Sequence, residues 1–291
     1  MKIYIALLSF FLCSCQETHS ELTMLCKLPK HLKEVSGMQY AKDGNFFYVI
    51  QDSGNGSFLY EIGLDGKEIK DALIGVENID WEDLASDKEG NLYFGDFGNN
   101  KNNRKNLGIY KVSKAAIQDE TMMPSPEYKV SFYYPEQTEF PPSKKELLYD
   151  CEAFFELNGF FYLFTKNRSK GFDGTTLIYK VPNKEGHHAA QLLGKYKTGE
   201  DYNDSAITGA AISPDGSKFV LLSHSKVWLF ENFKDDDFLN GTISVLELNH
   251  YSQKEAVCFK DNNTLLIADE KDKKTGGNVY EVNVESLKTK P

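Results

Sequence analysis

The sequence predicts an all-β protein, a single β-propeller, most simply with five four-stranded blades, and three observations carry this prediction. One strand–turn–strand unit recurs about every 45 to 70 residues along the chain. The composition includes 16 Tyr and 20 Phe but only 9 Pro, which favours short strands joined by tight turns. Four of the five copies are followed by an outer strand, whereas the fifth has none after it, and an apolar segment near the N-terminus can supply it.

Each copy of the unit opens with a short strand, turns at a glycine, aspartate or asparagine, and continues into an apolar strand and a third strand. The opening strands start at Ser36, Trp81, Cys151, Ile207 and Lys254. The turns that follow are Asp43-Gly44, Glu89-Gly90, Asn158-Gly159, Pro214-Asp215-Gly216 and Asp261-Asn262. A long repeat with four strands per unit is typical of propeller blades rather than of a sandwich.

The last copy needs a fourth strand from elsewhere, because it stops at Val282 and the tail over 285–291 is too polar to add one. We expect the segment Leu22 to Leu28 to form this outermost strand, which would close the ring and leave no open sheet edge. A six-bladed ring is the alternative. It would need a further unit within 113–150, where a second strand–turn–strand pattern is lacking.

The first residues have the order of a secretory signal. Met1-Lys2 is followed by the apolar run Ile3 to Leu12 and then by Leu12-Cys13-Ser14-Cys15. The run is too short to cross a bilayer as a stable helix. The segment ending at Cys15 resembles a bacterial lipobox, in which the last cysteine is acylated and becomes the new N-terminus. An uncleaved membrane anchor is the alternative.

The resemblance to a lipobox implies three parts of the chain and a location for the protein. Residues 1–15 are expected to be a lipoprotein signal peptide, 16–20 a linker and 21–291 the propeller domain. The protein is then expected to be a monomer in the bacterial cell envelope, outside the cytoplasm, that meets the membrane only through its lipid anchor.

The net charge and the cysteine content each argue against one class of protein: a nucleic-acid-binding protein and a protein built on a disulfide framework. The formal net charge is −10 and basic residues form no long run, so the chain lacks the electrostatic footprint of a nucleic-acid-binding protein. Cys26, Cys151 and Cys258 remain after the N-terminal pair, and an odd number argues against a disulfide framework. We expect three buried thiols, with a contact between Cys151 and Cys258 as the alternative.

The first strand of a propeller blade lines the central channel, so the starts of the five first strands meet at one mouth. Three glutamates and two hydroxyls occupy these starts: Ser36, Glu82, Glu152, Thr208 and Glu255. Like charges held close together either take up protons or bind a cation. A set made only of oxygen ligands suits Ca²⁺ better than Zn²⁺ or a redox metal. The alternative is that the glutamates pair sideways with Lys254, Lys166 or backbone N–H groups.

Four further residues in loops beside this ring are candidate catalytic residues: Asp52, Asp96, Lys166 and Arg168. Beside a bound metal, a carboxylate can position water, and Lys or Arg can neutralise the charge that develops on a phosphate. Both aspartates lie in glycine-rich loops, where Asp is also a common turn former. A Ser-His-Asp mechanism has no support, because no Gly-x-Ser-x-Gly segment occurs.

The five segments at the ring are Val-Ser-Gly, Trp-Glu-Asp-Leu, Cys-Glu-Ala, Ile-Thr-Gly-Ala and Lys-Glu-Ala-Val. In this order they resemble the calcium-activated nucleotidases, or apyrases, of animals. The resemblance implies a five-bladed propeller with one calcium ion on its axis, held by Ser and Glu side chains at these positions. It places Arg168 near a phosphate-binding arginine, but the long insertions of those enzymes are shorter here.

Other segments are similar to further propeller proteins. Trp-Glu-Asp-Leu-Ala and Gly-Asp-Phe-Gly-Asn are similar to uncharacterised bacterial exported propeller lipoproteins and, more loosely, to six-bladed lactonases and phytase-like proteins. Two functions therefore fit. One is a calcium-dependent hydrolase of phosphoanhydrides or other small esters. The other is a non-catalytic propeller with structural calcium, whose mouth binds a glycan or a protein partner.

Overall fold

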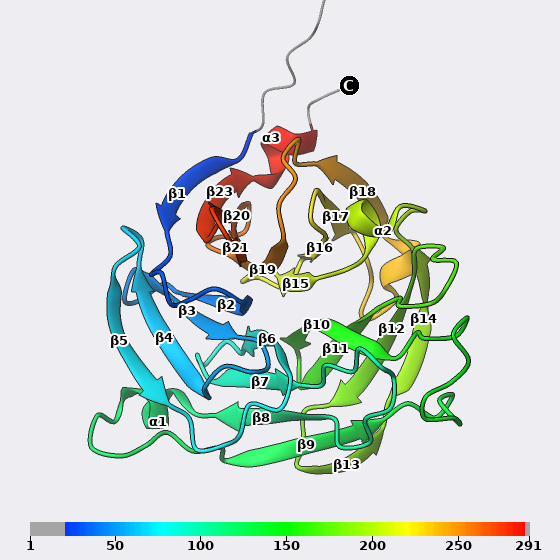
Figure 1. Cartoon of the computed structure of the whole chain (residues 1–291), viewed down its shortest axis with the longest axis horizontal. Helices are drawn as coiled ribbons and strands as arrows, with labels where there is room; N and C mark the ends of the chain where they lie inside the picture. The colour runs from blue at the N-terminus through cyan, green and yellow to red at the C-terminus, as the bar shows by residue number, and fades with distance from the viewer. Residues whose placement is uncertain (1–20, 289–291) are drawn as a thin grey trace, which may run out of the picture.

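The structure is a computed structural model that describes residues 21–288, and these residues form a ring of five antiparallel blades (Figure 1). The first strands of neighbouring blades contact one another around the ring, so each blade runs outward from the centre. The prediction of an all-β propeller with five blades is confirmed. The segment 113–150 adds one helix and one outer strand but no sixth blade.

The blades follow one another along the chain. Blade 1 contains β2 (Val35–Ala41), β3 (Phe46–Gln51), β4 (Phe58–Gly63) and β5 (Glu68–Leu73). Blade 2 contains β6 (Trp81–Ser86), β7 (Leu92–Asp96), β8 (Gly108–Val112) and β9 (Tyr128–Tyr133), with β13 (Gly186–Ala189) added in parallel to β9. Blade 3 contains β10 (Asp150–Leu157), β11 (Phe160–Lys166), β12 (Thr175–Pro182) and β14 (Gln191–Lys197).

The last two blades complete the ring. Blade 4 contains β15 (Gly209–Ile212), β16 (Lys218–Leu222), β17 (Lys226–Glu231) and β18 (Thr242–Glu247). Blade 5 contains β19 (Lys254–Phe259), β20 (Thr264–Asp269), β23 (Asn278–Asn283) and β1 (Thr23–Lys27). A small hairpin of β21 (Lys271–Asp272) and β22 (Thr275–Gly276) interrupts this blade.

In the part of the chain that the structure describes, helical structure is limited to four short segments. They are α1 (Lys114–Gln118), α2 (Tyr202–Ser205), the 3-10 turn η1 (Phe238–Asn240) and α3 (Val284–Lys288). Within residues 21–288, none of them has the length and apolar character that a membrane-spanning helix needs.

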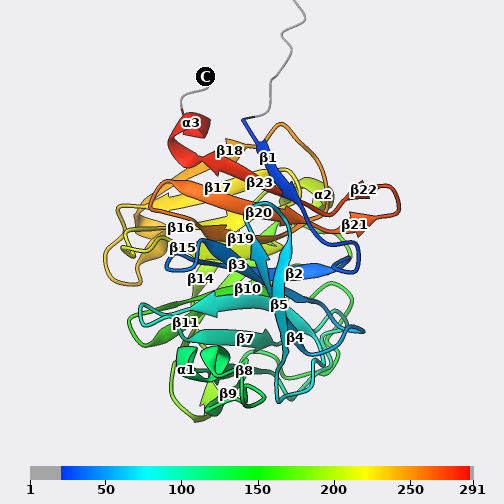
Figure 2. The ribbon, with the colours of Figure 1, turned by 90° about the vertical axis from the view of Figure 1, so that its left-hand side faces the viewer.

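The two ends of the described chain meet in blade 5, where β1 lies beside β23 (Figure 2). The strands are antiparallel, and Thr23 pairs with Glu281 while Lys27 pairs with Asn278. The predicted closure of the ring by the N-terminal strand is therefore confirmed. The signal peptide, the linker and Cys15, which were predicted over residues 1–20, lie outside the described residues.

The hydrophobic core is divided into five clusters, one between each pair of neighbouring blades. Between blades 1 and 2, for example, the ring of Trp81 packs on that of Phe94 with the centroids 5.0 Å apart. Because every blade is held on both sides, the positions of the first strands are set by packing around the whole ring. The three described cysteines, Cys26, Cys151 and Cys258, are buried free thiols, as predicted.

Tight turns set the register of the inner strands. Asn158 and Gly159, at the predicted turn of blade 3, both have positive φ angles, 53° and 82°. Two such residues in succession suit the turn whose twist matches that of a β-hairpin. The turn holds Leu157 opposite Phe160, and this register carries the start of β10 to the other end of the blade.

Candidate functional site

One cavity of about 220 Å³ lies where the first strands of the blades begin. Its lining includes all five residues that the sequence placed at the channel mouth, together with three of the four candidate catalytic residues. The ten lining residues are Ser36, Asp52, Glu82, Asn100, Glu152, Lys166, Arg168, Thr208, Glu255 and Glu270. Side chains from all five blades thus converge on a single small polar space.

β-Bulges distinguish the ring positions from their neighbours in the strands. In β2 the pairing with β3 shifts between Val35 and Gly37, so Ser36 has no residue directly opposite. The same shift occurs in β6, β10 and β19, at Glu82, Glu152 and Glu255. Thr208 immediately precedes β15. A bulge changes the direction of a side chain relative to the sheet, which accounts for the common aim of these residues at the cavity.

The two hydroxyl groups of the ring also join neighbouring blades. Ser36 Oγ donates a hydrogen bond of 2.8 Å to the carbonyl oxygen of Trp81 in blade 2. Thr208 Oγ1 donates one of 2.6 Å to the carbonyl oxygen of Lys254 in blade 5. Each hydroxyl uses its hydrogen in this bond and keeps its oxygen lone pairs for another contact.

Glu152 is the ring glutamate with the strongest positive surroundings. Lys166 Nζ lies 3.1 Å from Glu152 Oε2, and an Arg168 nitrogen lies 2.5 Å from the other carboxylate oxygen. Burial disfavours ionisation of Glu152, but the charges of Lys166 and Arg168 outweigh it and lower its pKa. Sideways pairing, the alternative considered from the sequence, is therefore what the structure has at Glu152.

Arg168 is held by three partners. Its Nε donates to Asp150 Oδ2 at 2.6 Å, one terminal nitrogen donates to Tyr202 Oη at 2.8 Å, and the other donates to Glu152. Asp150 is fully buried, and this burial, together with the charge of Glu152, raises its pKa although Arg168 opposes the effect. The guanidinium group is thus part of an ion network in the wall of the cavity.

Glu82 differs from Glu152 in having no such partner. Its side chain is buried, and within residues 21–288 its carboxylate makes no hydrogen bond or ion pair. Burial and the nearby carboxylates of Glu152 and Asp52 raise its pKa well above the usual range. A buried carboxylate in this state needs either a proton or a cation beside it.

The remaining ring glutamate, Glu255, faces two basic groups. His224 Nε2 lies 3.0 Å from Glu255 Oε1, and Lys166 Nζ lies 4.0 Å from the other oxygen. Lys254, the other expected partner for a ring glutamate, instead donates to the carbonyl oxygens of His224 and His250. Its ammonium group therefore anchors the loops of blades 4 and 5 rather than a carboxylate.

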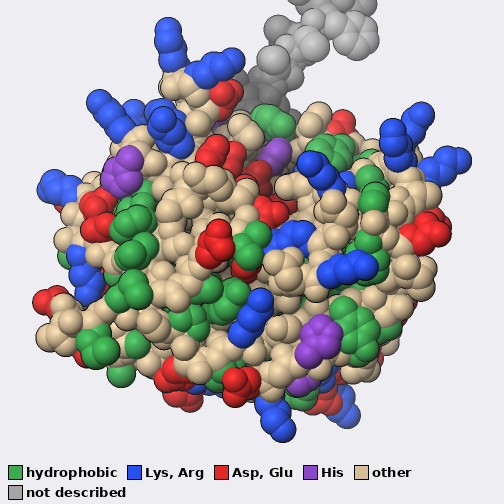
Figure 3. Space-filling model, turned by 60° about the horizontal axis from the view of Figure 1, so that its bottom comes forward, with side chains coloured by type: hydrophobic (Ala, Val, Ile, Leu, Met, Phe, Trp, Pro, Cys, Tyr) green, Lys and Arg blue, Asp and Glu red, His purple; other side chains and the backbone are tan. Residues whose placement is uncertain are grey.

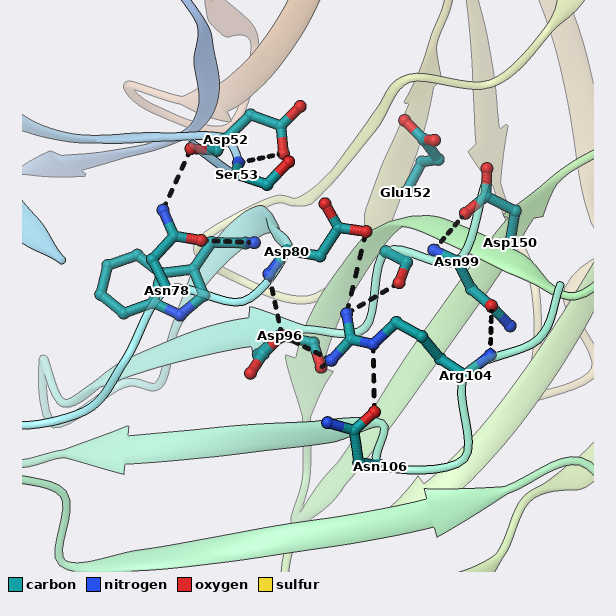
Figure 4. A network of polar contacts seen from close by, with 12 residues as sticks. Asp52, Ser53, Asn78, Asp80, Asp96, Asn99, Arg104, Asn106, Asp150 and Glu152 are labelled. Atoms are coloured by element: carbon teal, nitrogen blue, oxygen red, sulfur yellow. Dashed lines mark hydrogen bonds and ion pairs between the residues drawn. The ribbon is translucent and has the colours of Figure 1, made fainter. Parts of the chain in front are cut away.

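Asp96 is the candidate catalytic residue that the structure does not place at the cavity. Its side chain is fully buried at the end of β7, where Oδ1 accepts a hydrogen bond of 2.8 Å from Arg104 (Figure 4). The backbone N–H of Asp80 donates to the same oxygen at 3.2 Å. Asp96 thus holds the loops of blade 2 in place and does not line the cavity, because Arg104 folds back onto it.

Two acidic residues beside the cavity were missed in the sequence. Asp80 lies two residues before Glu82, and Asp150 lies two residues before Glu152. One carboxylate oxygen from each lies within 4.8 Å of a Glu82 oxygen. The signal that could have identified them is the repeated Asp-x-Glu pattern at the start of the first strand in blades 2 and 3.

Two further carboxyl groups lie at the rim. Burial raises the pKa of Asp52 to about 6 and that of Glu270 to about 8, and the charges of Glu255 and then Asp52 also raise the pKa of Glu270. Asp52 follows β3 in blade 1, and Glu270 follows β20 in blade 5. The cavity is therefore flanked by carboxyl groups on neighbouring blades.

The charges in the cavity do not balance. Of its lining residues, Asp52, Glu82, Glu152, Glu255 and Glu270 are acidic, while Lys166 and Arg168 are basic, which leaves a formal charge of −3 (−5 + 2). Acidic and basic side chains are interspersed over the face seen in Figure 3, so the negative charge of the protein is not gathered in one patch there. An uncompensated set of oxygen donors around buried Glu82 fits a hard divalent cation such as Ca²⁺.

Comparison with known proteins finds similarity to solved structures but no matching family model or curated protein. Among solved structures, the chain is similar to a catalytically inactive variant of virginiamycin B lyase from Staphylococcus aureus with quinupristin, with 12% identity and a TM-score of 0.41 over 88% of this chain and 68% of the other.

Two further solved structures are aligned with this chain over nearly their whole length. U3-55K has 11% identity and a TM-score of 0.44 over 90% of this chain and 98% of the other. The RRP9 WD40 repeats have 9% identity and a TM-score of 0.46 over 90% and 99%. The resemblance to calcium-activated nucleotidases continues to rest on the sequence motifs alone.

Proposed function

We propose that this protein is an exported, lipid-anchored propeller that binds calcium at its mouth and hydrolyses phosphoanhydrides or other small ester substrates there. One observation carries the proposal: a small polar cavity in which carboxylates outnumber basic groups, yet Lys166 and Arg168 stand beside them. Carboxylates would hold the cation, and the cation and the basic groups together would attract an anionic substrate.

Each group in the cavity can be given a task in such a reaction. Bound calcium would supply electrophilic polarisation of a phosphate oxygen. Lys166, whose ammonium group reaches Glu152 with one hydrogen, has others to offer to the oxygen that becomes more negative. Asp52 or Glu270 orients a water molecule and takes its proton as the water oxygen bonds to phosphorus and the bond to the leaving oxygen breaks.

The experiment that tests this proposal is an activity panel. The purified mature protein is assayed with nucleotides, phosphomonoesters and lactones, with calcium and with a chelator. Calcium-dependent release of inorganic phosphate would support the proposal, and a Lys166→Met variant should reduce it. Absence of turnover on the whole panel, in a protein that still binds calcium, would contradict the hydrolase and leave the binding function.

Calcium is expected to stabilise the fold. A ligand that binds only the folded state contributes about 2.7 kcal/mol to the free energy of unfolding at a hundredfold excess over its Kd. For a protein of this size that corresponds to a rise in Tm of roughly 5 °C or more. Differential scanning calorimetry with calcium, with magnesium and with EDTA measures it. Equal Tm values in calcium and EDTA would remove the calcium site from the proposal.

A second function is favoured by one specific observation. All three nitrogen positions of Arg168 already contact Asp150, Tyr202 or Glu152, so this residue is committed within the protein. A non-catalytic propeller, with structural calcium and a mouth that binds a glycan or a protein partner, accounts for such a commitment. A calcium-dependent signal on a glycan array, without turnover in the activity panel, would support it.

The lipid anchor rests on the segment Leu12-Cys13-Ser14-Cys15. Replacing Cys15 with Ser is expected to leave the precursor unprocessed or to release the protein from the membrane, because serine has no thiol to be acylated. Fractionation and intact mass, with Cys13→Ser as the control, measure the result. The anchor would be disproved by a Cys15→Ser protein with the location and mass of the parent.

A further inference from the structure

We infer that the calcium ion of the proposed function binds off the centre of the ring, between Asp52, Asp80 and Glu82, rather than among the five residues at the starts of the first strands. The inference rests on that function only in taking a calcium ion to be bound. Two groups of three carboxylates share Glu82: one is completed by Asp52 and Asp80, the other by Asp150 and Glu152. Within each group the nearest oxygens all lie within 4.8 Å of one another.

The group with Asp150 and Glu152 is already neutralised. Arg168 donates to both carboxylates, and Lys166 lies 3.1 Å from Glu152. The backbone N–H of Asn99 donates to the second oxygen of Asp150 at 2.6 Å. A calcium ion placed there would meet two fixed positive charges at short range, inside a cavity where water screens them poorly.

The group with Asp52 and Asp80 has far less compensation. Asp52 Oδ1 accepts the backbone N–H of Ser53, which brings no net charge (Figure 4). The guanidinium of Arg104 reaches Asp80 only at 3.8 Å, because the same group is bound to Asp96 at 2.8 Å. Three carboxylates therefore share one basic group that is mainly engaged elsewhere.

The lack of a partner for the buried carboxylate of Glu82 among residues 21–288 is the observation that indicates a ligand. Glu82 is 6% exposed, lines the cavity, and within the described chain has no donor to its carboxylate. A buried carboxylate that lacks a hydrogen-bond donor is costly unless a cation or proton satisfies it. Of the two clusters of three carboxylates to which Glu82 belongs, the one with Asp52 and Asp80 opposes a cation less, because its one basic neighbour among the described residues, Arg104, is bound mainly to Asp96.

Gly98 leaves room for the carboxylates of Glu82 and Asp80. A methyl group on its Cα would overlap Glu82 Oε1 and come within 2.5 Å of Asp80 Oδ2. The backbone N–H of Gly98 also donates to the carbonyl oxygen of Asp80, at 3.2 Å. The second glycine of the Gly-Asp-Phe-Gly-Asn segment thus allows two carboxylates to approach each other closely. If Asp52 is a ligand, Glu270 becomes the rim carboxylate that orients water.

Isothermal titration calorimetry with calcium chloride tests the position of the ion. The mature protein is compared with Asp80→Asn, with Glu255→Gln, and with Glu120→Gln, an exposed acidic residue that controls for the general loss of charge. Loss of a metal-site partner typically lowers affinity about 10- to 100-fold, and we expect this for Asp80→Asn. We expect Glu255→Gln to lower it less than about threefold, since Glu255 faces His224 and Lys166.

The opposite ranking, with Glu255→Gln the weaker binder and Asp80→Asn like the parent, would place the ion at the ring centre and overturn the inference. Asp52→Asn, at a half-buried loop position, serves as a second variant if Asp80→Asn does not fold, and it should show the same loss. A parent protein that does not bind calcium would instead refute the calcium site of the proposed function, so the two failures are distinguishable.

Discussion

Deleting residues 21–28 is expected to unfold the protein or drive it into aggregates. The deletion removes β1, which pairs with β23, and it removes Cys26 and Leu28, which are buried between blades 5 and 1. Burial of each apolar side chain contributes about 1.5–3 kcal/mol, and each lost backbone hydrogen bond adds about 1 kcal/mol. The sum is comparable to the whole stability of an average domain, about 5–15 kcal/mol.

The deletion also exposes the edge of β23, and this exposure is expected to cause the aggregation. Without β1, the outer side of β23 presents a row of unpaired backbone donors and acceptors to other molecules. Thermal melting and size-exclusion chromatography measure both consequences. Deleting residues 16–20, predicted from the sequence to be a linker, is the matched control and should leave the Tm unchanged. If the longer deletion melts like the parent, β1 contributes little to the closure of the ring.

Replacing Arg168 with Ala is expected to destabilise the fold by about 3–5 kcal/mol, because it leaves the buried carboxylates of Asp150 and Glu152 without a main partner. From the sequence, Arg168 was a candidate for neutralising charge on a substrate phosphate. The structure gives it a structural role as well, since the guanidinium is engaged with three side chains.

Urea denaturation measures this destabilisation. Lys197→Ala is a suitable control, since Lys197 pairs with Asp173 at the surface and is 70% exposed, so its loss should change the free energy of unfolding by less than about 1 kcal/mol. Arg168→Lys keeps the charge but not the forked geometry and should fall between the two. An Arg168→Ala protein as stable as the parent would show that this ion network contributes little to the free energy of unfolding.

The site could be predicted from the sequence as far as position within a repeat allows. Glu82, Glu152 and Glu255 were assigned to one mouth because each lies at the start of the first strand of its blade, and the structure does bring them to one cavity. The β-bulges that aim them were not predictable, because a bulge depends on the pairing of two strands and not on the bulged residue itself.

The partners of the charged side chains could not be predicted from the sequence for a similar reason. In the sequence, nothing distinguishes Asp96 from the other candidate catalytic residues, but in the structure Arg104 folds back onto it. Glu82 and Glu152 occupy equivalent positions in the repeat. In the structure, only Glu152 of these two glutamates has Lys166 and Arg168 beside it. Such choices depend on side-chain direction and on loops whose paths are set by contacts across blades.

The sequence by itself determined the class of fold, the number of blades and the strand that closes the ring. These follow from local signals: the period of apolar residues, the turn residues, and the missing outer strand of the last copy. Only the tertiary structure decided which acidic groups are neutralised and which are left without a partner. Burial and short-range charge act between atoms that packing brings together from distant parts of the chain, and they vary over a few ångströms.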